Sequence, residues 1–206
     1  MIVGKRVRFR AVEKADQHLL VSWINDPYIS QLVGGWSFPI SLAAQEDWFS
    51  RVMNDQKNQR WMVESLEGEP LGLTGLSQID WHNRTAFPAL KLGASNSRGK
   101  GYGTDAIMTL MTYAFLDVGL NRLWGEILPH NIESYKAFVE KCGWRVEGVF
   151  RQHIYRNGVY MDQLRVAILR DEFLRLPQAK DYIPAEFESK IEVRPEHWAL
   201  PDISRS

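Results

Sequence analysis

One short segment decides the fold of this chain: Arg98-Gly99-Lys100-Gly101-Tyr102-Gly103-Thr104-Asp105-Ala106. Glycines let several backbone N–H groups converge on one anion, and a helix N-terminus adds positive partial charge. Arg98 and Lys100 add full charges. From Tyr102 to Val118 apolar residues recur at helical spacing, and Gly119 ends the pattern. The segment therefore predicts a phosphate-binding loop that opens a long, buried helix.

Two other phosphate-binding motifs are close to this segment. A Walker loop needs four residues between its first glycine and Gly-Lys, followed by Ser or Thr. Here five residues separate Gly93 from Gly99, and Gly101 follows the lysine, so we reject that motif. The spacing Gly101-x-Gly103-x-x-Ala106 does satisfy the dinucleotide fingerprint, with Glu126 about twenty residues further on. That fingerprint opens a repeated βαβ series, and the elements expected around this loop have a different order.

The periodicity on either side of the loop predicts the remaining elements. Upstream we expect a strand at residues 2–9, helices at 17–25 and 41–54, and strands at 61–66, 71–81 and 87–93. Downstream we expect a strand at 122–128, a helix at 132–141, and strands at 145–155 and 159–169 joined by Asn157-Gly158. Pro27 should end the first helix, with a loop after it. This order predicts an α+β fold with a mixed, mostly antiparallel central sheet of six to seven strands, flanked by about four helices.

The composition is that of a soluble globular domain, with 206 residues, 45% of them hydrophobic and 24% charged. Lys plus Arg and Asp plus Glu number 25 each, so no net field recruits nucleic acid or an anionic membrane. The sequence contains no run of about 18 apolar residues. The single Cys142 allows no intrachain disulfide and joins no cluster at zinc spacing. We expect a cytoplasmic protein with no metal, no nucleic-acid partner and no membrane partner.

Prolines mark a change near the end of the chain. Four of the nine prolines lie at or after Pro177, so no regular helix or strand can continue for long there. The segment is also too short to form a second domain. We therefore expect a single domain at residues 1–176 and a proline-rich extension at 177–206 that lies on or over it.

A second block of sequence extends the pattern set by the loop. It runs from Asn131-x-x-Ser134 to Glu140-Lys141-Cys142-Gly143-Trp144, within the helix expected at 132–141. Together with Arg98-x-x-Gly101-x-Gly103, this block resembles the motifs of the GNAT superfamily of acetyl-CoA-dependent N-acetyltransferases. The resemblance extends to the order of elements over about residues 2–173. Among subfamilies, the chain is similar to the Rim-type protein N-terminal acetyltransferases and to their relatives that act on polyamines and amino sugars.

The resemblance implies a binding site for acetyl-CoA as co-substrate. The strands at 87–93 and 122–128 should splay apart and admit the pantetheine arm, which the amide of Asn131 would hold. A backbone N–H near Leu92 or Gly93 would polarise the thioester carbonyl, and the glycine loop would bind the pyrophosphate. The expected acetyl-CoA contacts are Leu92, Gly93, Arg98, Gly99, Lys100, Gly101, Tyr102, Gly103, Thr104 and Asn131.

Acetyl transfer to an amine requires a neutral nucleophile, so the resemblance also implies a general base. Glu126 is the first candidate, because it lies between apolar neighbours near the expected splay. His153 is the second. The usual tyrosine that protonates the leaving thiolate is replaced by Val139 in this chain. Ser134 and Tyr135 are the candidates for that role, with Ser134 ranked slightly higher.

The acceptor is expected beside the loop between the first two helices, where the GNAT fold places it. Residues 31–39 contain Trp36 and Phe38 but no carboxylate, whereas a site for a polycation would present several. Asp80 or Glu46 could add acidity from neighbouring segments. We therefore expect a peptide N-terminus or an amino sugar as acceptor, a polyamine as the alternative, and a homodimer as one option for assembly. A non-catalytic acyl-CoA-binding regulatory module on the same fold is the alternative function.

Overall fold

The computed structural model describes residues 1–33, 38–52, 54–93, 99–188 and 191–193. These residues form an eight-stranded sheet in the order β1-β2-β3-β4-β5-β6-β8-β7. Every strand contact is antiparallel except that of β5 with β6. The strands are β1 (Ile2–Val3), β2 (Val7–Ala11), β3 (Gln59–Ser65), β4 (Pro70–Asp80), β5 (Thr85–Leu92), β6 (Arg122–Ile127), β7 (Arg145–Arg156) and β8 (Val159–Leu169).

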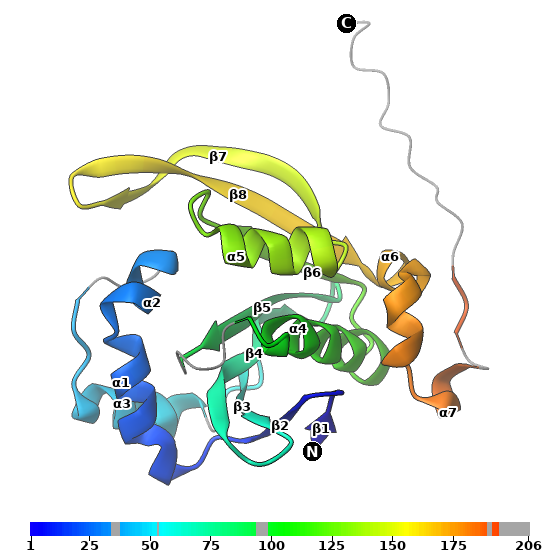
Figure 1. The fold of residues 1–206 in the computed structure, drawn as a ribbon, viewed down its shortest axis with the longest axis horizontal. Helices are drawn as coiled ribbons and strands as arrows, with labels where there is room; N and C mark the ends of the chain where they lie inside the picture. The colour runs from blue at the N-terminus through cyan, green and yellow to red at the C-terminus, as the bar shows by residue number, and fades with distance from the viewer. Residues whose placement is uncertain (34–37, 53, 94–98, 189–190, 194–206) are drawn as a thin grey trace, which may run out of the picture.

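The helices lie on both faces of this sheet and at one side of it (Figure 1). They are η1 (Lys14–Asp16), α1 (Gln17–Ile24), α2 (Pro27–Leu32), α3 (Leu42–Val52), α4 (Tyr102–Thr112), η3 (Tyr113–Asp117), α5 (Ile132–Tyr135), η4 (Lys136–Lys141), α6 (Arg170–Arg175), η5 (Pro177–Asp181) and α7 (Ala185–Glu188). Helix α4 runs directly into the π-helical η3, and α5 runs directly into η4. The predicted α+β class and mostly antiparallel sheet are confirmed. The sheet has one strand more than expected. The single strand predicted at residues 2–9 is interrupted near Gly4 and forms two strands, β1 and β2, which pair with each other.

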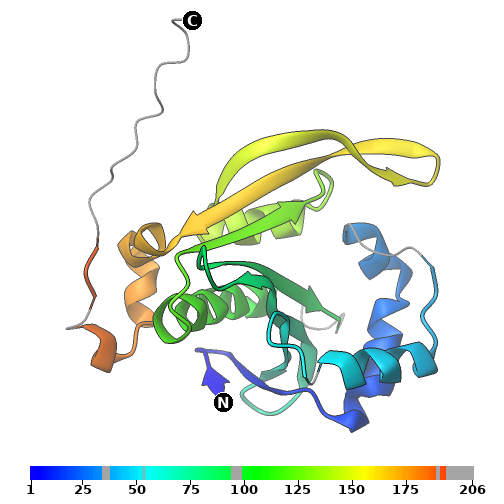
Figure 2. The same cartoon turned by 180° about the vertical axis from the view of Figure 1, so that it is seen from behind.

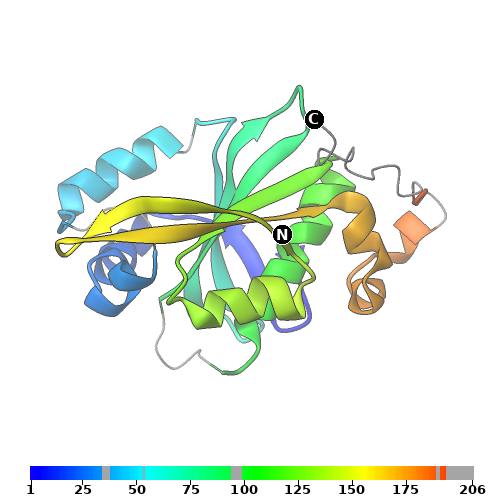
Figure 3. The same ribbon diagram turned by 90° about the horizontal axis from the view of Figure 1, so that it is seen from above.

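The main hydrophobic core lies between the sheet and helix α4. Met108, Leu110 and Met111 from α4 are buried in one cluster with Leu123 from β6 and Trp144. A smaller cluster on the other face packs α1 and α3 against the sheet, and its members are Val12, Leu20, Met62, Leu19, Trp23, Trp48, Phe49 and Leu73. In the view from above, α3 and α5 lie on opposite sides of the β7–β8 hairpin (Figure 3). The two faces of the sheet therefore carry different helices.

The contact between β5 and β6 is short. Strand β5 pairs with β4 along most of its length, whereas its parallel contact with β6 covers two residue pairs, Thr85 with Arg122 and Ala86 with Leu123. Beyond these pairs β6 continues along β8 as far as Ile127. The predicted splay between the two strands is therefore present in the structure.

Backbone geometry explains where this contact ends. The Gly93 N–H donates to the Leu71 carbonyl oxygen at 2.9 Å, so Gly93 directs its backbone groups toward β4. Backbone direction alternates along a strand, and Leu92, Leu90 and Pro88 therefore face the β6 side. Pro88 has no N–H to donate and cannot extend a ladder in that direction. The ladder stops at this proline, and the backbone groups of Leu90 and Leu92 face the gap.

One expectation about the first helical region is wrong. The expected helix does end before Pro27, at Ile24, but Pro27 begins a second helix, α2, where a loop was expected. The Asp26 carboxylate caps this helix by accepting the N–H groups of Tyr28 and Ile29 at 2.7 and 3.2 Å. Proline is favoured at this position because its missing N–H would have no intrahelical partner. The segment expected to be a loop therefore contributes a helix to the site.

Asp105, in the first turn of α4, joins the two ends of the described chain. Its buried carboxylate accepts the backbone N–H groups of residues 5–7 at 3.2, 2.8 and 2.9 Å. It also accepts the Tyr182 hydroxyl at 2.7 Å. Burial and this hydrogen bond raise the pKa of Tyr182. Seen from behind, α6 and α7 lie beside α4, on the side opposite α1–α3 (Figure 2).

Within the described residues, no helix has the length and apolar character needed to cross a membrane. Cys142 is fully buried, and burial raises the pKa of its thiol to about 12. Cys142 is therefore a residue of the hydrophobic core.

Candidate active site

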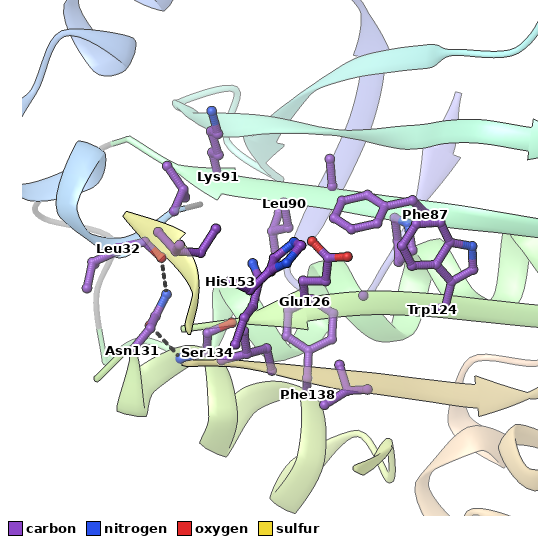
Figure 4. A pocket seen from close by; sticks show the side chains of 18 of the residues that line it. Leu32, Phe87, Leu90, Lys91, Trp124, Glu126, Asn131, Ser134, Phe138 and His153 are labelled. Carbon is purple, nitrogen blue, oxygen red and sulfur yellow. Dashed lines mark hydrogen bonds between the residues drawn. The ribbon is translucent and has the colours of Figure 1, made fainter. Parts of the chain in front are cut away.

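A cavity of about 460 Å³ occupies the gap between β5 and β6, and we call it the splay cavity. Figure 4 shows Glu126 from β6, His153 from β7, and Ser134 and Phe138 from the α5–η4 helix around this space. Lys91 of β5 lies at its edge. Strands β5, β6 and β7 and the α5–η4 helix thus all contribute side chains to this cavity.

A second cavity of about 350 Å³, the loop cavity, lies between α2, the glycine loop and α5. Both cavities share a set of lining residues, namely Leu32, Val33, Leu90, Lys91, Asn131, Ser134 and Phe138. The two spaces therefore adjoin. Together they offer room for an extended ligand that begins at the loop and ends between the strands.

The glycine loop contributes four of its predicted residues to the loop cavity, which are Gly99, Gly101, Gly103 and Thr104. Lys100 is exposed and Tyr102 packs against the main core, and neither lines this cavity. Arg98 lies outside the described residues. The loop cavity also contains Lys136 and Lys141 from η4, two cations that were not predicted as acetyl-CoA contacts, although Lys141 lies within the second motif.

Glycine has a specific role at the start of α4. Gly101 is the N-cap with φ +82°, a left-handed conformation that other residues adopt at a cost. Gly103 has an ordinary φ, and an added Cβ would meet Leu92 Cδ1 at 3.5 Å, which is normal contact. The first N–H groups of a helix have no intrahelical partner. At α4 these groups adjoin a cavity and can therefore bind an anion.

Gly93 and Leu92 were the two predicted oxyanion donors, and of these only the backbone N–H of Leu92 faces the gap between β5 and β6. The Gly93 N–H is engaged with Leu71 in the sheet. Leu92 alternates with it and directs its N–H away from β4. Gly93 is required for a different reason, because a Cβ there would lie 2.1 Å from the Trp23 ring.

Both the oxygen and the nitrogen of the Asn131 side-chain amide form hydrogen bonds with other residues of the chain. Its Oδ1 accepts the Ser134 N–H at 3.0 Å and caps α5. Its Nδ2 donates to the Leu32 carbonyl oxygen at 2.8 Å. Asn131 lines both cavities, so the amide lies at the predicted place but also connects two helices.

Glu126 lies in a more polar setting than its strand neighbours indicated. Arg165 Nη1 donates to Glu126 Oε1 at 2.9 Å, and both side chains are about one quarter exposed, at 25% and 27%. The same guanidinium stacks on the Trp124 ring at 3.4 Å from its centroid. A positioned cation stabilises the charged carboxylate. A cation that the strand pattern did not predict therefore joins the expected apolar neighbours of Glu126, and the carboxylate does line the splay cavity.

Of the remaining catalytic candidates, His153 and Ser134 are among the described residues that line a cavity and Tyr135 is not. His153 is exposed, lines the splay cavity and lies 5.3 Å from Phe150, measured between ring centroids. Ser134 lines both cavities. Tyr135 instead packs against the main hydrophobic core and is absent from the described lining of either cavity. Position therefore favours Ser134 over Tyr135.

The end of α2 is held over the site by side chains from elsewhere. Arg156, His130 and Asn131 donate to four successive carbonyl groups at residues 30–33. The bonds are Arg156 to Ser30 (2.6 Å) and Val33 (2.8 Å), His130 to Gln31 (2.9 Å), and Asn131 to Leu32 (2.8 Å). We call this set the α2 clamp. It fixes α2 beside both cavities.

The predicted acceptor residues are not assembled in the splay cavity. Trp36 lies outside the described residues. Phe38 is 54% exposed and Asp80 sits at the β4–β5 turn, where Asn83 donates to its carboxylate through backbone and side chain at 2.9 and 2.7 Å. These hydrogen bonds lower the pKa of Asp80. Neither Phe38 nor Asp80 is among the described lining residues.

Sequence analysis missed three polar groups of this site: Lys91, Gln163 and Arg165. They sit on strands where alternation predicts only which face they share. Lys91 and Gln163 line the splay cavity, and Arg165 pairs with Glu126. Among the described residues, no group of three His, Cys, Asp or Glu side chains could hold a metal ion.

Comparison with known proteins identifies what this arrangement is similar to. A family model described as "Acetyltransferase (GNAT) domain" matches residues 6–145. A Bacillus subtilis protein named "Probable N-acetyltransferase YjcK" is 34% identical over 188 residues, covering 84% of this chain and 98% of that protein. A Vibrio cholerae spermidine N(1)-acetyltransferase is 22% identical and covers 84% of this chain and 98% of its own length. A crystal structure of the Vibrio cholerae spermidine N-acetyltransferase with CoA and spermine aligns with TM-score 0.77 at 24% identity, covering 82% of this chain and 98% of that one.

Proposed function

The chain belongs to the GNAT family of acetyltransferases, and from this we propose how its own residues bind acetyl-CoA and acetylate a primary amine. It is an N-acetyltransferase, as the family and its relatives show. The observation that carries the residue assignment is the gap between β5 and β6, which opens next to the glycine loop. Acetyl-CoA supplies an acetyl group activated as a thioester.

The loop cavity suits the phosphate end of acetyl-CoA. The N–H groups at the start of α4 provide donors, and Lys136 and Lys141 add positive charge. The pantetheine end suits the gap, where Leu90 and Leu92 present backbone groups that no strand uses. Asn131 lies between these two regions and is placed to hold the arm.

The acceptor amine has to lose a proton before it attacks. An alkylammonium of pKa ~10 costs about 4 kcal/mol to deprotonate at pH 7. Glu126 is the proposed base, directly or through a water, because its carboxylate faces the splay cavity. The ion pair with Arg165 holds that carboxylate in position. His153, on the facing strand β7, is the second candidate.

The leaving thiolate requires a proton as the amide forms. Ser134 is the proposed donor, because it lines both cavities at the point where they adjoin. Val139 replaces the tyrosine expected for this role. Tyr135 packs into the core and is the weaker candidate.

The proposed acceptor is a small-molecule or peptide amine of low positive charge. Glu126 is the one carboxylate among the described residues that line the splay cavity, and it is already paired with Arg165. A polyamine would find little negative charge there. The relative named for spermidine shares 22% identity with this chain, which is too little to transfer its acceptor.

A thiol-release assay with acetyl-CoA and a panel of peptides, amino sugars and polyamines tests this function. We expect amine-dependent release of CoA thiol and a matching acetylated product by mass spectrometry. Calorimetry on the same protein measures acetyl-CoA affinity separately. Tight binding without thiol release for any amine would support the alternative, a non-catalytic acyl-CoA-binding module.

A further inference from the structure

Lys91 lies where three cavities meet. It lines the splay cavity, the loop cavity and a third cavity of about 230 Å³ between the sheet and helices α1 and α3, which we call the tryptophan cavity. Trp23 and Trp48 form part of the third cavity. Figure 4 shows the Lys91 side chain pointing away from Glu126 and Ser134.

The Lys91 ammonium makes no hydrogen bond or ion pair with any described residue. Its side chain is partly buried, and burial lowers the pKa of Lys91, with a further decrease from the like charge of Arg60. A buried charge without a counter-charge is unfavourable. The free protein therefore keeps an uncompensated cation beside its candidate acceptor site.

Arg60 adds a second cation to the tryptophan cavity. Its guanidinium donates to three neutral oxygens, those of Gln59 (2.9 Å), Leu76 (3.0 Å) and the Ser77 hydroxyl (2.7 Å). Burial lowers the pKa of Arg60, and Asp55 opposes this through space without an ion pair. The described lining of the cavity contains no Asp or Glu.

The splay cavity also offers oxygen acceptors. Gln163 is 3% exposed, lines the cavity, and its Oε1 has no hydrogen-bond donor among the described residues. The Glu126 carboxylate faces the same space. Two oxygen acceptors suited to an amine thus line the splay cavity, and two cations line the adjoining tryptophan cavity.

We infer that the acceptor is an amine that also carries an acidic group, and that Lys91 and Arg60 bind this group while Glu126 and Gln163 face the amine. The inference rests on the proposed function and specifies its substrate class. The acidic group is a carboxylate or a phosphate, because either anion can accept from an ammonium and a guanidinium. The tryptophan cavity leaves apolar space beside that anion for part of the acceptor.

Matched acceptor pairs test this inference. One arm compares amino acids with their carboxamides, and the other compares an amino sugar with its phosphate ester, so that carboxylate and phosphate are distinguished. For each pair kcat/KM is measured with wild-type protein, Lys91→Met, Lys91→Arg and the exposed control Lys14→Met. Each amine has the same intrinsic reactivity toward every variant, so the change in the acidic-to-neutral ratio isolates the contribution of Lys91.

We expect wild-type protein to prefer the acidic member of at least one pair by about tenfold or more, since hydrogen bonds to charged groups are the strong ones. Lys91→Met should reduce that preference to about threefold or less, while Lys91→Arg and Lys14→Met retain it. Circular dichroism and thermal unfolding show that each variant is folded, independently of any ligand.

Two results would overturn the inference, and they are distinguishable. If neutral amines react as well as their acidic partners and Lys91→Met leaves the ratio unchanged, the acidic acceptor is wrong and acetyl transfer stands. If no amine releases thiol although acetyl-CoA binds, the proposed function fails and the inference fails with it.

Discussion

The side-chain amide of Asn131 donates to the backbone carbonyl of Leu32 at 2.8 Å. This bond connects the start of α5 to the end of α2, two segments that are 99 residues apart in the chain. Each segment lines both the splay cavity and the loop cavity. Asn131 therefore influences the shape of the site as well as any contact with acetyl-CoA.

Two substitutions separate the roles of Asn131. Asn131→Asp keeps an oxygen to cap Ser134 but loses the donor to Leu32, whereas Asn131→Ala loses both. We expect Asn131→Ala to lower the free energy of unfolding by about 1 kcal/mol and Asn131→Asp to lower it less. Both should raise the KM for acetyl-CoA. Urea unfolding and initial-rate kinetics measure the two effects, and equal stability loss in both variants would contradict the capping role.

The glycine loop gives a second matched pair. A Cβ at Gly103 makes ordinary contact with Leu92, so Gly103→Ala should fold normally and extend into the loop cavity. We expect its acetyl-CoA affinity to fall about tenfold, because the approach of phosphate to the helix N-terminus is blocked. Gly101→Ala should also lose about 1 kcal/mol of stability, since φ is +82° there. Unchanged affinity in a folded Gly103→Ala protein, measured by calorimetry, would remove the loop from the binding site.

The proposed base is tested by the pH dependence of Glu126→Gln. The expected loss of kcat/KM is greatest near pH 7 and smallest at pH 9 to 10, where more of the amine is already neutral. Arg165→Met should reduce activity less, because it leaves the carboxylate present but unheld. An activity loss of the same size at every pH would indicate a structural role for Glu126. Full activity of the variant at pH 7 would make His153 the next residue to substitute.

Lys91 should carry a cost in stability in the free protein. Burial lowers its pKa below the ordinary value, so the folded state disfavours the ammonium form. Wild-type stability should then rise with pH between the lowered folded pKa and the unfolded pKa of about 10.4. Replacing the ammonium by an apolar side chain removes this penalty, so Lys91→Met should be more stable at neutral pH by about 1 kcal/mol. The gain should shrink as the pH approaches 10, and thermal unfolding from pH 6 to 10 measures it.

Much of the fold was predictable because local pattern and tertiary environment agree. The strand expected at 159–169 has the observed bounds Val159–Leu169, and the hairpin turn Asn157-Gly158 has positive φ at both residues. Helix α2 was missed because Pro27 was given its role as a helix stop, although Asp26 before it is a typical N-cap. The same residue type ends or begins a helix, and its neighbours decide which.

Site residues that lie within a short contiguous motif could be predicted from the sequence. Site residues that are brought together by strand pairing could not. The loop and Asn131 lie within contiguous motifs, and the structure places most of them at the cavities. The pairing of Glu126 with Arg165 joins positions 39 residues apart and depends on the register of β6 and β8. Lys91 could not be predicted for another reason. It is of interest because it has no hydrogen-bond or ion-pair partner among the described residues, and the sequence alone does not show which groups surround a side chain.

The contact of Asp105 with Tyr182 has a consequence for the order in which parts of the protein fold during synthesis. These residues are 77 positions apart, so the helix that faces the loop cavity emerges long before its last hydrogen-bond donor has been synthesised. The N–H groups of residues 5–7 are already present by then and can occupy the Asp105 carboxylate. A nascent chain can thus hold the start of this helix with residues 5–7 alone, and Tyr182 adds its hydrogen bond to Asp105 after 77 more residues have been synthesised.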